Sequence, residues 1–208
     1  MATTIQEYVA ERGINFLMHF TRAGNLPSIL ARGLVRRDTL TLEGFDGFND
    51  QHRIDGTDAV CLSIGFPNYK MFFRLRQENK EESWAVLVVQ PQVLWELDCA
   101  FCCTNAASNS VTAISLADRK GLAALQAMYG DWPTKPRAEL NLPNGLPTNP
   151  QAEVLVLHGV PRKYISGVVT LTEAHKEELA AANPGLQVWA RAQFFRYRND
   201  HSHWKPGA

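Results

Sequence analysis

The chain has 208 residues, of which 45% are hydrophobic and 20% charged, and these proportions are ordinary for one globular domain with a substantial core. Its 21 basic and 21 acidic residues cancel to a formal net charge of zero, which argues against a protein that holds nucleic acid through bulk charge alone, although a local basic stripe stays compatible with it. The N-terminus has no signal-like segment and no apolar run approaches the roughly 20 residues of a membrane span, so we expect a cytoplasmic protein without membrane association.

The first part of the chain predicts a helix over 8–12, a strand over 15–21 and a second helix that begins near Leu26. Asn25 is its expected cap, and Gly33 is expected to end it. Residues 38–58 show little periodicity and surround Arg53 with acidic residues. Because strands are expected on both sides, we interpret this segment as a long functional loop.

The middle of the chain predicts two buried strands, over 59–64 and 84–89, with an amphipathic helix over 68–79 between them. One or two helical turns over 91–97, a short strand over 101–104 and a helix over 115–129 should follow. Cys99 and Cys102 have C-x-x-C spacing, but no second pair follows. We therefore interpret them as apolar strand residues, and we expect no metal site.

A proline-rich loop over 130–150 leads into an apolar strand over 154–157. Gln151 and Glu153 precede this strand two residues apart, and on a strand both side chains would point to the same face. A carboxylate at the mouth of an apolar strand is costly unless it is hydrogen-bonded, paired or used. A fixed acid beside a long loop is typical of a catalytic site.

The last part of the chain predicts a strand over 165–171, a helix over 173–182 and closing strands over 186–190 and 193–197. The polar tail over 198–208 is expected to be frayed. Strands and helices mix without a regular βαβ repeat, which favours an α+β sheet core. The chain lacks the glycine-rich dinucleotide motif, the P-loop, the H-E-x-x-H motif and the G-x-S-x-G motif, so the common enzymes that carry them are excluded.

Three segments together resemble a known family. They are His19-Phe20-Thr21 with the helix after it, Arg53 ahead of the strand from Ala59, and Gln151-Ala152-Glu153-Val154. In this order and spacing the chain resembles the DarT-type ADP-ribosyltransferase toxins, which modify bases in DNA with NAD. The resemblance implies one ADP-ribosyltransferase domain over 1–208, with a split, mostly antiparallel β core and flanking helices.

The resemblance also implies a division of roles. Glu153 would be the catalytic acid and Arg53 its helper, within an NAD-binding loop over 38–58, while 130–153 would form a substrate-recognition loop. NAD, as co-substrate, would contact His19, Phe20, Thr21, Ser28, Arg36 and Arg53. Single-stranded DNA would contact Gln151, Trp132, Lys135, Arg137 and Arg74. The expected partners are single-stranded DNA and a cognate antitoxin that removes ADP-ribose.

The chemistry of the transfer fits these residue types. Breaking the bond between nicotinamide and ribose builds positive charge on the sugar, which a fixed carboxylate such as Glu153 stabilises. The diphosphate of NAD is matched by the fork of an arginine.

Plainer interpretations stay open at this stage. Glu153 would also fit an ordinary strand-end acid whose hydrogen bonds are satisfied, and His19 would fit a histidine packed in the core. Arg53 would simply balance the negative charges around it. The acceptor would be thymine or guanine in DNA, or else RNA or a protein side chain, because Gln151-x-Glu153 also resembles the pattern of protein-modifying enzymes. A non-enzymatic nucleic-acid-binding module is the last alternative.

Overall fold

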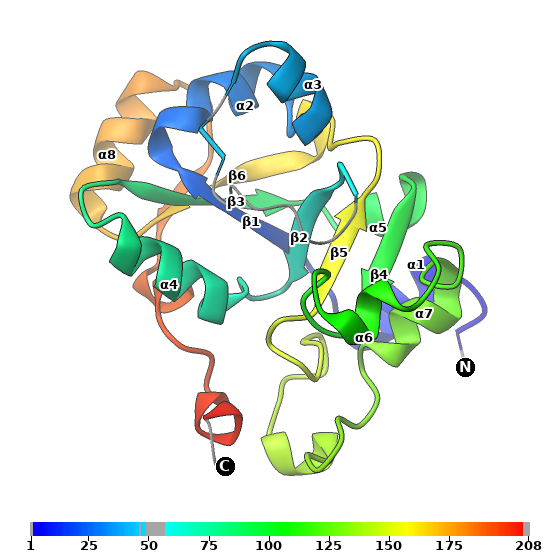
Figure 1. The fold of residues 1–208 in the computed structure, drawn as a ribbon. Helices are drawn as coiled ribbons and strands as arrows, with labels where there is room; N and C mark the ends of the chain where they lie inside the picture. Colours follow the sequence, from blue (N-terminus) through cyan, green and yellow to red (C-terminus); the bar gives the residue numbers. More distant parts are fainter. Residues whose placement is uncertain (1, 46, 49–56, 206–208) are drawn as a thin grey trace.

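The structure is a computed structural model that describes residues 2–45, 47–48 and 57–205. These residues form one seven-stranded sheet in the order β4-β5-β2-β1-β3-β6-β7, with helices packed around it (Figure 1). The strands are β1 Leu17–Arg22, β2 Val60–Ile64, β3 Trp84–Val89, β4 Cys99–Cys102, β5 Glu153–Val156, β6 Ile165–Thr170 and β7 Val188–Ala190. Neighbouring strands are antiparallel except for the parallel pair β6 and β7. The predicted α+β, mostly antiparallel core is therefore confirmed.

The sheet is split between β1 and β2. Along β1 all six residues pair with β3, but within the described residues β1 pairs with β2 only at Leu17 and Met18. Beyond Met18 the two strands diverge, so that β4-β5-β2 and β1-β3-β6-β7 form two half-sheets joined at one end (Figure 1).

Two hydrophobic cores cover the faces of the β1 half-sheet, because side chains alternate along β1. Leu17 packs into the larger core with α1, α2 and α5, whereas Met18 packs into the smaller one with Phe72 of α4. The α-helices are α1 Ile5–Arg12, α2 Leu26–Arg32, α3 Arg37–Leu42, α4 Tyr69–Glu78, α5 Val93–Glu96, α6 Asn109–Thr112, α7 Gly121–Ala127 and α8 Glu173–Ala182. The 3₁₀ helices are η1 Ala23–Asn25, η2 Arg137–Leu140, η3 Arg162–Tyr164, η4 Ala192–Phe195 and η5 His201–Trp204.

Several predicted elements are wrong in extent or type. The helix expected over 115–129 is only α7, because Gly121 begins it with φ of +80° and the residues before it form a turn. The first part of the loop expected over 38–58 is helical, as α3. The closing strand expected over 193–197 is instead the 3₁₀ helix η4.

The C-terminal segment from Arg198 to Lys205 is anchored by two buried residues, so the prediction of a frayed tail over 198–208 is wrong for this part of it. Arg198 and Asp200 are 4% and 3% exposed and form an ion pair with an N–O distance of 2.6 Å. The Arg198 guanidinium also donates to the carbonyls of Pro147 and Thr148, at 2.9 and 2.8 Å. The C-terminal segment is thereby fixed to the loop that precedes Glu153.

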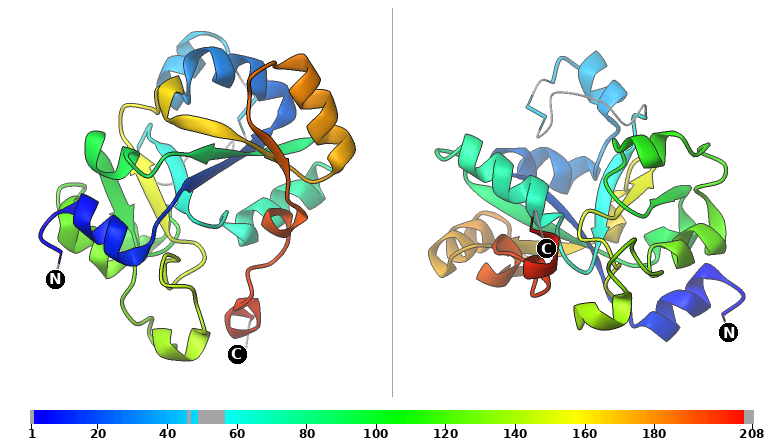
Figure 2. Two further views of the ribbon diagram at one scale, coloured as in Figure 1. Left: turned by 180° about the vertical axis from the view of Figure 1, so that it is seen from behind. Right: turned by 60° about the horizontal axis from the view of Figure 1, so that its bottom comes forward.

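The two described ends of the chain lie in different parts of the molecule. Figure 2 shows α1 beside α7, at the edge of one half-sheet, whereas η5 lies below α4 and beside the loop over 130–150. Among the described residues, no helix combines the length and the apolar character that crossing a membrane would require.

Candidate functional site

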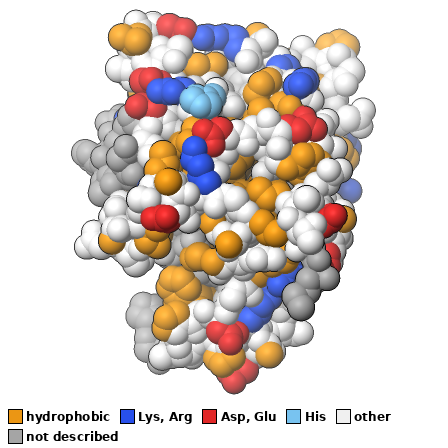
Figure 3. Space-filling view, turned by 90° about the vertical axis from the view of Figure 1, so that its right-hand side faces the viewer, with side chains coloured by type: hydrophobic (Ala, Val, Ile, Leu, Met, Phe, Trp, Pro, Cys, Tyr) orange, Lys and Arg blue, Asp and Glu red, His pale blue; other side chains and the backbone are white. Residues whose placement is uncertain are grey.

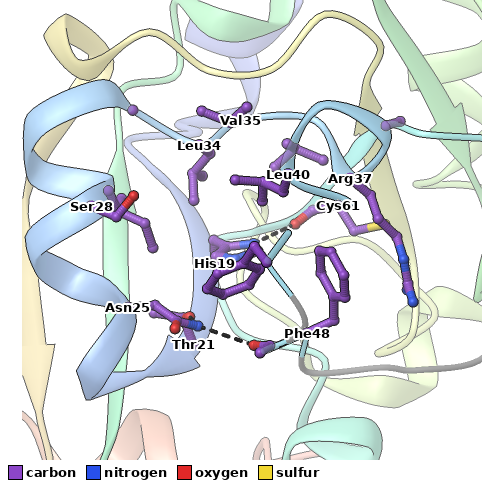
Figure 4. A pocket seen from close by; sticks show the side chains of 16 residues that line it. His19, Thr21, Asn25, Ser28, Leu34, Val35, Arg37, Leu40, Phe48 and Cys61 are labelled. Atoms are coloured by element: carbon purple, nitrogen blue, oxygen red, sulfur yellow. Dashed lines mark hydrogen bonds between the residues drawn. The ribbon is translucent and has the colours of Figure 1, made fainter. Parts of the chain in front are cut away.

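A cavity of about 220 Å³ lies between β1, α2, α3 and β2 (Figure 4). It opens on the side of β1 to which His19 and Thr21 point, at the place where β1 and β2 diverge. Three residues predicted to bind NAD line it, namely His19, Thr21 and Ser28. The structure therefore brings together one part of the predicted site.

The His19 ring bridges the two half-sheets. Its Nδ1 lies 2.9 Å from the carbonyl oxygen of Cys61 on β2, and because a carbonyl only accepts, Nδ1 carries the proton. Burial lowers the pKa of His19, and the hydrogen bond to Cys61 offsets this in part. The ring is therefore neutral near pH 7, and its Nε2 is a hydrogen-bond acceptor.

Thr21 is 2% exposed, and its hydroxyl accepts a hydrogen bond from the Asn25 amide at 3.1 Å. The same amide lies 3.5 Å from the carbonyl oxygen of Gly47. Asn25 was predicted to cap α2, but its side chain makes no capping bond because η1 precedes the helix. It lines the cavity instead, a role that sequence reasoning missed.

Phe20 and Arg36 do not line the cavity. Phe20 points to the other face of β1, as strand alternation requires, and stacks on Phe72 with ring centroids 4.6 Å apart. The Arg36 guanidinium makes a two-point contact with the Asp38 carboxylate. Among the described residues, the arginine that lines the cavity is Arg37, whose guanidinium carbon lies 4.3 Å from the centroid of the Phe48 ring.

Glu153 is the first residue of β5 and is only 6% exposed. Among the described residues, three N–H groups hold its carboxylate. The Ala106 backbone donates to Oε2 at 2.7 Å, and the amides of Asn68 and Asn105 lie 3.2 and 3.5 Å from Oε1. Such donors stabilise a buried negative charge, so Glu153 is a fixed carboxylate at the start of an apolar strand.

The residues that hold Glu153 come from distant segments. Asn68 is the N-cap of α4, where its side-chain oxygen accepts from the backbone of Met71, while its backbone N–H donates to Ser63. The sequence showed Asn68 only as a helix start, and Asn105 only as a turn residue. Neither pattern indicates that the amide reaches an acid elsewhere in the chain.

His19 and Glu153 lie on either side of β2. His19 bonds the Cys61 carbonyl of β2, and Cys61 pairs with Leu155, two residues after Glu153 on β5. Glu153 does not line the cavity that His19 and Thr21 line. Arg53, predicted to act in the same site, lies outside the described residues, as does much of the predicted NAD-binding loop.

The residues predicted to contact DNA lie in different surroundings. Gln151 lies in a turn before β5, so the expectation that it shares a strand face with Glu153 is wrong. The guanidinium of Arg137 donates within the loop, to Thr148, Pro143 and Asn144. Arg74 is exposed, 3.9 Å from Glu78, while Trp132 and Lys135 form a small β-bridge.

Within residues 2–45, 47–48 and 57–205, no three His, Cys, Asp or Glu side chains are grouped so that they would hold a metal ion. The C-x-x-C residues Cys99 and Cys102 are buried on β4, where burial raises the pKa of both thiols, to about 12 and about 11. Their apolar surroundings agree with the interpretation as strand residues.

The chain is similar to a known family in sequence and to solved structures in fold. A family model described as "DarT: ssDNA thymidine ADP-ribosyltransferase, DarT" matches residues 18–194. No curated protein matches the chain in sequence.

Among solved structures, the chain is similar to Thermosipho africanus DarTG in complex with ADP-ribose, with a TM-score of 0.60, 17% identity and coverage of 87% of this chain. It spans 51% of that DarTG chain. Thermus sp. 2.9 DarT in complex with NAD+ gives a TM-score of 0.53 and 17% identity, over 88% of this chain and 98% of the other. The same Thermus protein in complex with ADP-ribosylated ssDNA gives a TM-score of 0.52 and 14% identity, over 88% of this chain and 97% of the other.

Proposed function

This chain belongs to the DarT family of ssDNA thymidine ADP-ribosyltransferases, and on that premise we propose how its residues carry out the reaction. The enzyme transfers ADP-ribose from NAD, its co-substrate, to a base of single-stranded DNA and releases nicotinamide. Thymine is the base named for the family, and we propose it as the acceptor here.

The observation that carries this proposal is the pairing of two features across β2. One is the cavity with neutral His19 and buried Thr21, and the other is the Glu153 carboxylate held by three N–H donors. The cavity volume of about 220 Å³ is below the roughly 300–1,000 Å³ of common ligand pockets. The described cavity therefore suits one part of a dinucleotide and not the whole of it.

The lining of the cavity suits NAD chemically. His19 Nε2 is an acceptor for a ribose hydroxyl, and Ser28 adds a second hydroxyl contact. In the part of the chain that the structure describes, Arg37 is the arginine that lines the cavity, so we assign the diphosphate contact to it in place of Arg36. Phe48 presents a ring beside Arg37, suited to a planar base.

The reaction breaks the bond between ribose C1′ and the nicotinamide nitrogen, and the electron pair leaves with nicotinamide. Positive charge develops on the ribose, and the Glu153 carboxylate stabilises it. A nitrogen of the base then attacks C1′ and forms the new bond, and its proton leaves to solvent. Arg53 stays our proposal for the residue that steadies NAD and assists this deprotonation.

The base must be accessible, and a duplex hides its reactive nitrogen, so single-stranded DNA is the substrate. On the face that Figure 3 shows, Lys and Arg side chains lie among acidic ones and form no broad basic field. The formal net charge of the chain is zero as well, so we propose that DNA contact is local and includes Gln151, Trp132, Lys135 and Arg74.

We further propose that the enzyme is a cytoplasmic toxin accompanied by an antitoxin that removes ADP-ribose. Support comes from the similarity to DarTG, a chain about twice as long whose structure contains ADP-ribose. Expression of the enzyme alone should then arrest bacterial growth, and Glu153→Ala should relieve the arrest.

The test of the proposed function is to incubate the protein with labelled NAD and, separately, single-stranded DNA, duplex DNA, RNA and protein. Label is expected on single-stranded DNA, and mass spectrometry of its nucleosides identifies the base. Glu153→Gln should lower transfer by roughly 10²–10³-fold, as loss of a transition-state contact does, while the exposed Glu177→Ala should leave it unchanged. Label on RNA or protein alone, or full activity of Glu153→Gln, contradicts the proposal.

A further inference from the structure

Two tryptophans and two lysines from the loop over 130–150, α4 and η5 lie close together. Figure 1 shows the three segments that carry them. The rings of Trp132 and Trp204 are 6.1 Å apart between centroids. The ammonium nitrogens of Lys70 and Lys135 each lie 5.9 Å from the centroid of the Trp204 ring. We call Trp132, Trp204, Lys70 and Lys135 the tryptophan–lysine cluster.

The cluster is connected to the catalytic acid through α4. Asn68, whose amide lies 3.2 Å from Glu153 Oε1, caps this helix, and Lys70 follows two residues later. Lys70 donates to the Trp204 carbonyl at 3.2 Å, while Trp132 belongs to the loop that runs into Glu153. Lys70 therefore lies about half a helical turn along the chain from the side chain that holds the acid.

The surrounding hydrogen bonds fix Trp204 in place. Its indole N–H donates to Asp200 Oδ2 at 2.7 Å, and Asp200 is itself the buried partner of Arg198. Arg198 in turn holds the carbonyls of Pro147 and Thr148. A ring held in this way loses little conformational freedom when a ligand stacks on it.

The electrostatics of the cluster favour an anion. Burial lowers the pKa of Lys70, and the positive charge of Lys135 lowers it further, because the two ammonium groups repel each other. Within the described part of the chain, no acidic side chain forms an ion pair with Lys70. A phosphate placed near Lys70 would relieve this repulsion.

Exposed aromatic rings continue the surface along α4. Tyr197 is 47% exposed and stacks on the His201 ring at 5.1 Å with an interplanar angle of 13°. Phe73, 39% exposed, contacts Tyr197 at 5.3 Å. Aromatic faces next to cationic side chains are the usual means of holding single strands, because bases stack on the rings and phosphates meet the charges.

We propose that the tryptophan–lysine cluster, extended by Tyr197, binds the single-stranded DNA that flanks the modified base. Bases stack on Trp204 and Tyr197, and Lys70 and Lys135 contact phosphates. This inference rests on the proposed function and adds to it a C-terminal half of the DNA site. Trp204 and Tyr197 lie beyond residues 18–194, the part of the chain that the family model matches.

The test measures binding of a fluorescein-labelled single-stranded oligonucleotide by anisotropy, at several salt concentrations. Trp204→Ala should weaken binding by about fivefold or more, since stacking of one base on a ring is worth at least that, and Trp204→Phe should recover most of it. Lys70→Gln should reduce the slope of log K against log salt by about 0.7, the value for one phosphate of a single strand. Trp204→Ala should leave that slope unchanged.

Lys163→Gln is the matched control, because the Lys163 ammonium nitrogen also lies over a ring, 4.8 Å from the centroid of Tyr164, but outside the cluster. It should change neither the affinity nor the slope. Thermal unfolding checks that each variant is folded, and Lys70→Gln tests the site independently of any destabilisation in Trp204→Ala. Duplex DNA should bind more weakly, because its bases are not available to stack.

Transfer kinetics separate the two proposals. If wild-type protein labels no single-stranded DNA, the proposed function fails. If the wild type labels DNA but Trp204→Ala and Lys70→Gln keep the wild-type KM for DNA and the wild-type affinity, the inference is overturned. The expected result is a raised KM for DNA in both variants with an unchanged KM for NAD.

Discussion

Replacing Asp200 with leucine should strongly destabilise the protein. The Arg198 guanidinium, 4% exposed, would lose the only carboxylate with which it forms an ion pair in the described residues and stay buried with its charge. Removing one partner of a buried pair costs about 3–5 kcal/mol. For a chain of this size, each kcal/mol corresponds to roughly 2–4 °C in Tm, so a fall of about 6–20 °C is expected.

The size of the loss is set by the partners of the pair. Arg198 makes two hydrogen bonds to Asp200 and one to each of two loop carbonyls. In Arg198→Met/Asp200→Leu the stranded charge is gone, although the carbonyls of Pro147 and Thr148 lose their donor. The double variant should therefore cost about 2 kcal/mol less than the sum of the single variants.

Urea unfolding followed by circular dichroism measures these free energies. Glu78→Leu is the control, because Glu78 pairs with Arg74 at 3.9 Å on the surface and its loss should change stability by less than about 0.5 kcal/mol. A loss below about 1 kcal/mol in Asp200→Leu, or additive single variants, would refute the reasoning that the pair fixes the C-terminal segment.

Three further outcomes follow from single side chains. Burial lowers the pKa of His19, so below about pH 6.5 the unfolded chain binds a proton that the folded protein does not. Stability should therefore decrease as the pH is lowered below about 6.5, by up to about 1.4 kcal/mol per pH unit. Urea unfolding of His19→Gln at the same pH values should lack this decrease. Gly33→Ala should lose about 2 kcal/mol or more in the same assay, because φ is +87° and the new Cβ would lie 2.2 Å from the Val160 carbonyl oxygen, whereas Gly13→Ala, with open space around it, should lose less. Tyr69→Phe should leave stability unchanged or slightly higher, since the buried hydroxyl has no hydrogen-bond partner in the described residues. In the wild type, burial raises the pKa of Tyr69 to about 12, so the variant should lack the tyrosine ionisation near pH 12 in an absorbance titration.

Much of the sheet could be predicted because its strands are short, apolar and rich in β-branched residues. The run from Trp84 to Val89 and the helix from Glu173 to Ala182 have the predicted bounds. Glu153 was identifiable for a similar reason, since an acid at the entrance to an apolar strand conflicts with its surroundings unless it is held or used.

Other features depend on contacts between distant segments, which local patterns do not contain. Whether Arg36 or Arg37 lines the cavity depends on where α3 begins, and the sequence predicted a loop there. The donors to Glu153 come from Asn68 and Asn105, far away along the chain. The tail looked frayed because its polar residues find their buried partners about 50 residues earlier.

The parting of β1 from β2 also bears on how the protein avoids aggregation. Strand edges that face solvent attract other chains, and a split creates two such edges inside a sheet. Here His19 Nδ1 donates a hydrogen bond to the Cys61 carbonyl, and residues of α2 and α3 line the cavity between the two strands. With this carbonyl already bonded and two helices around the opening, the edges of β1 and β2 are less available for pairing with a strand of another protein.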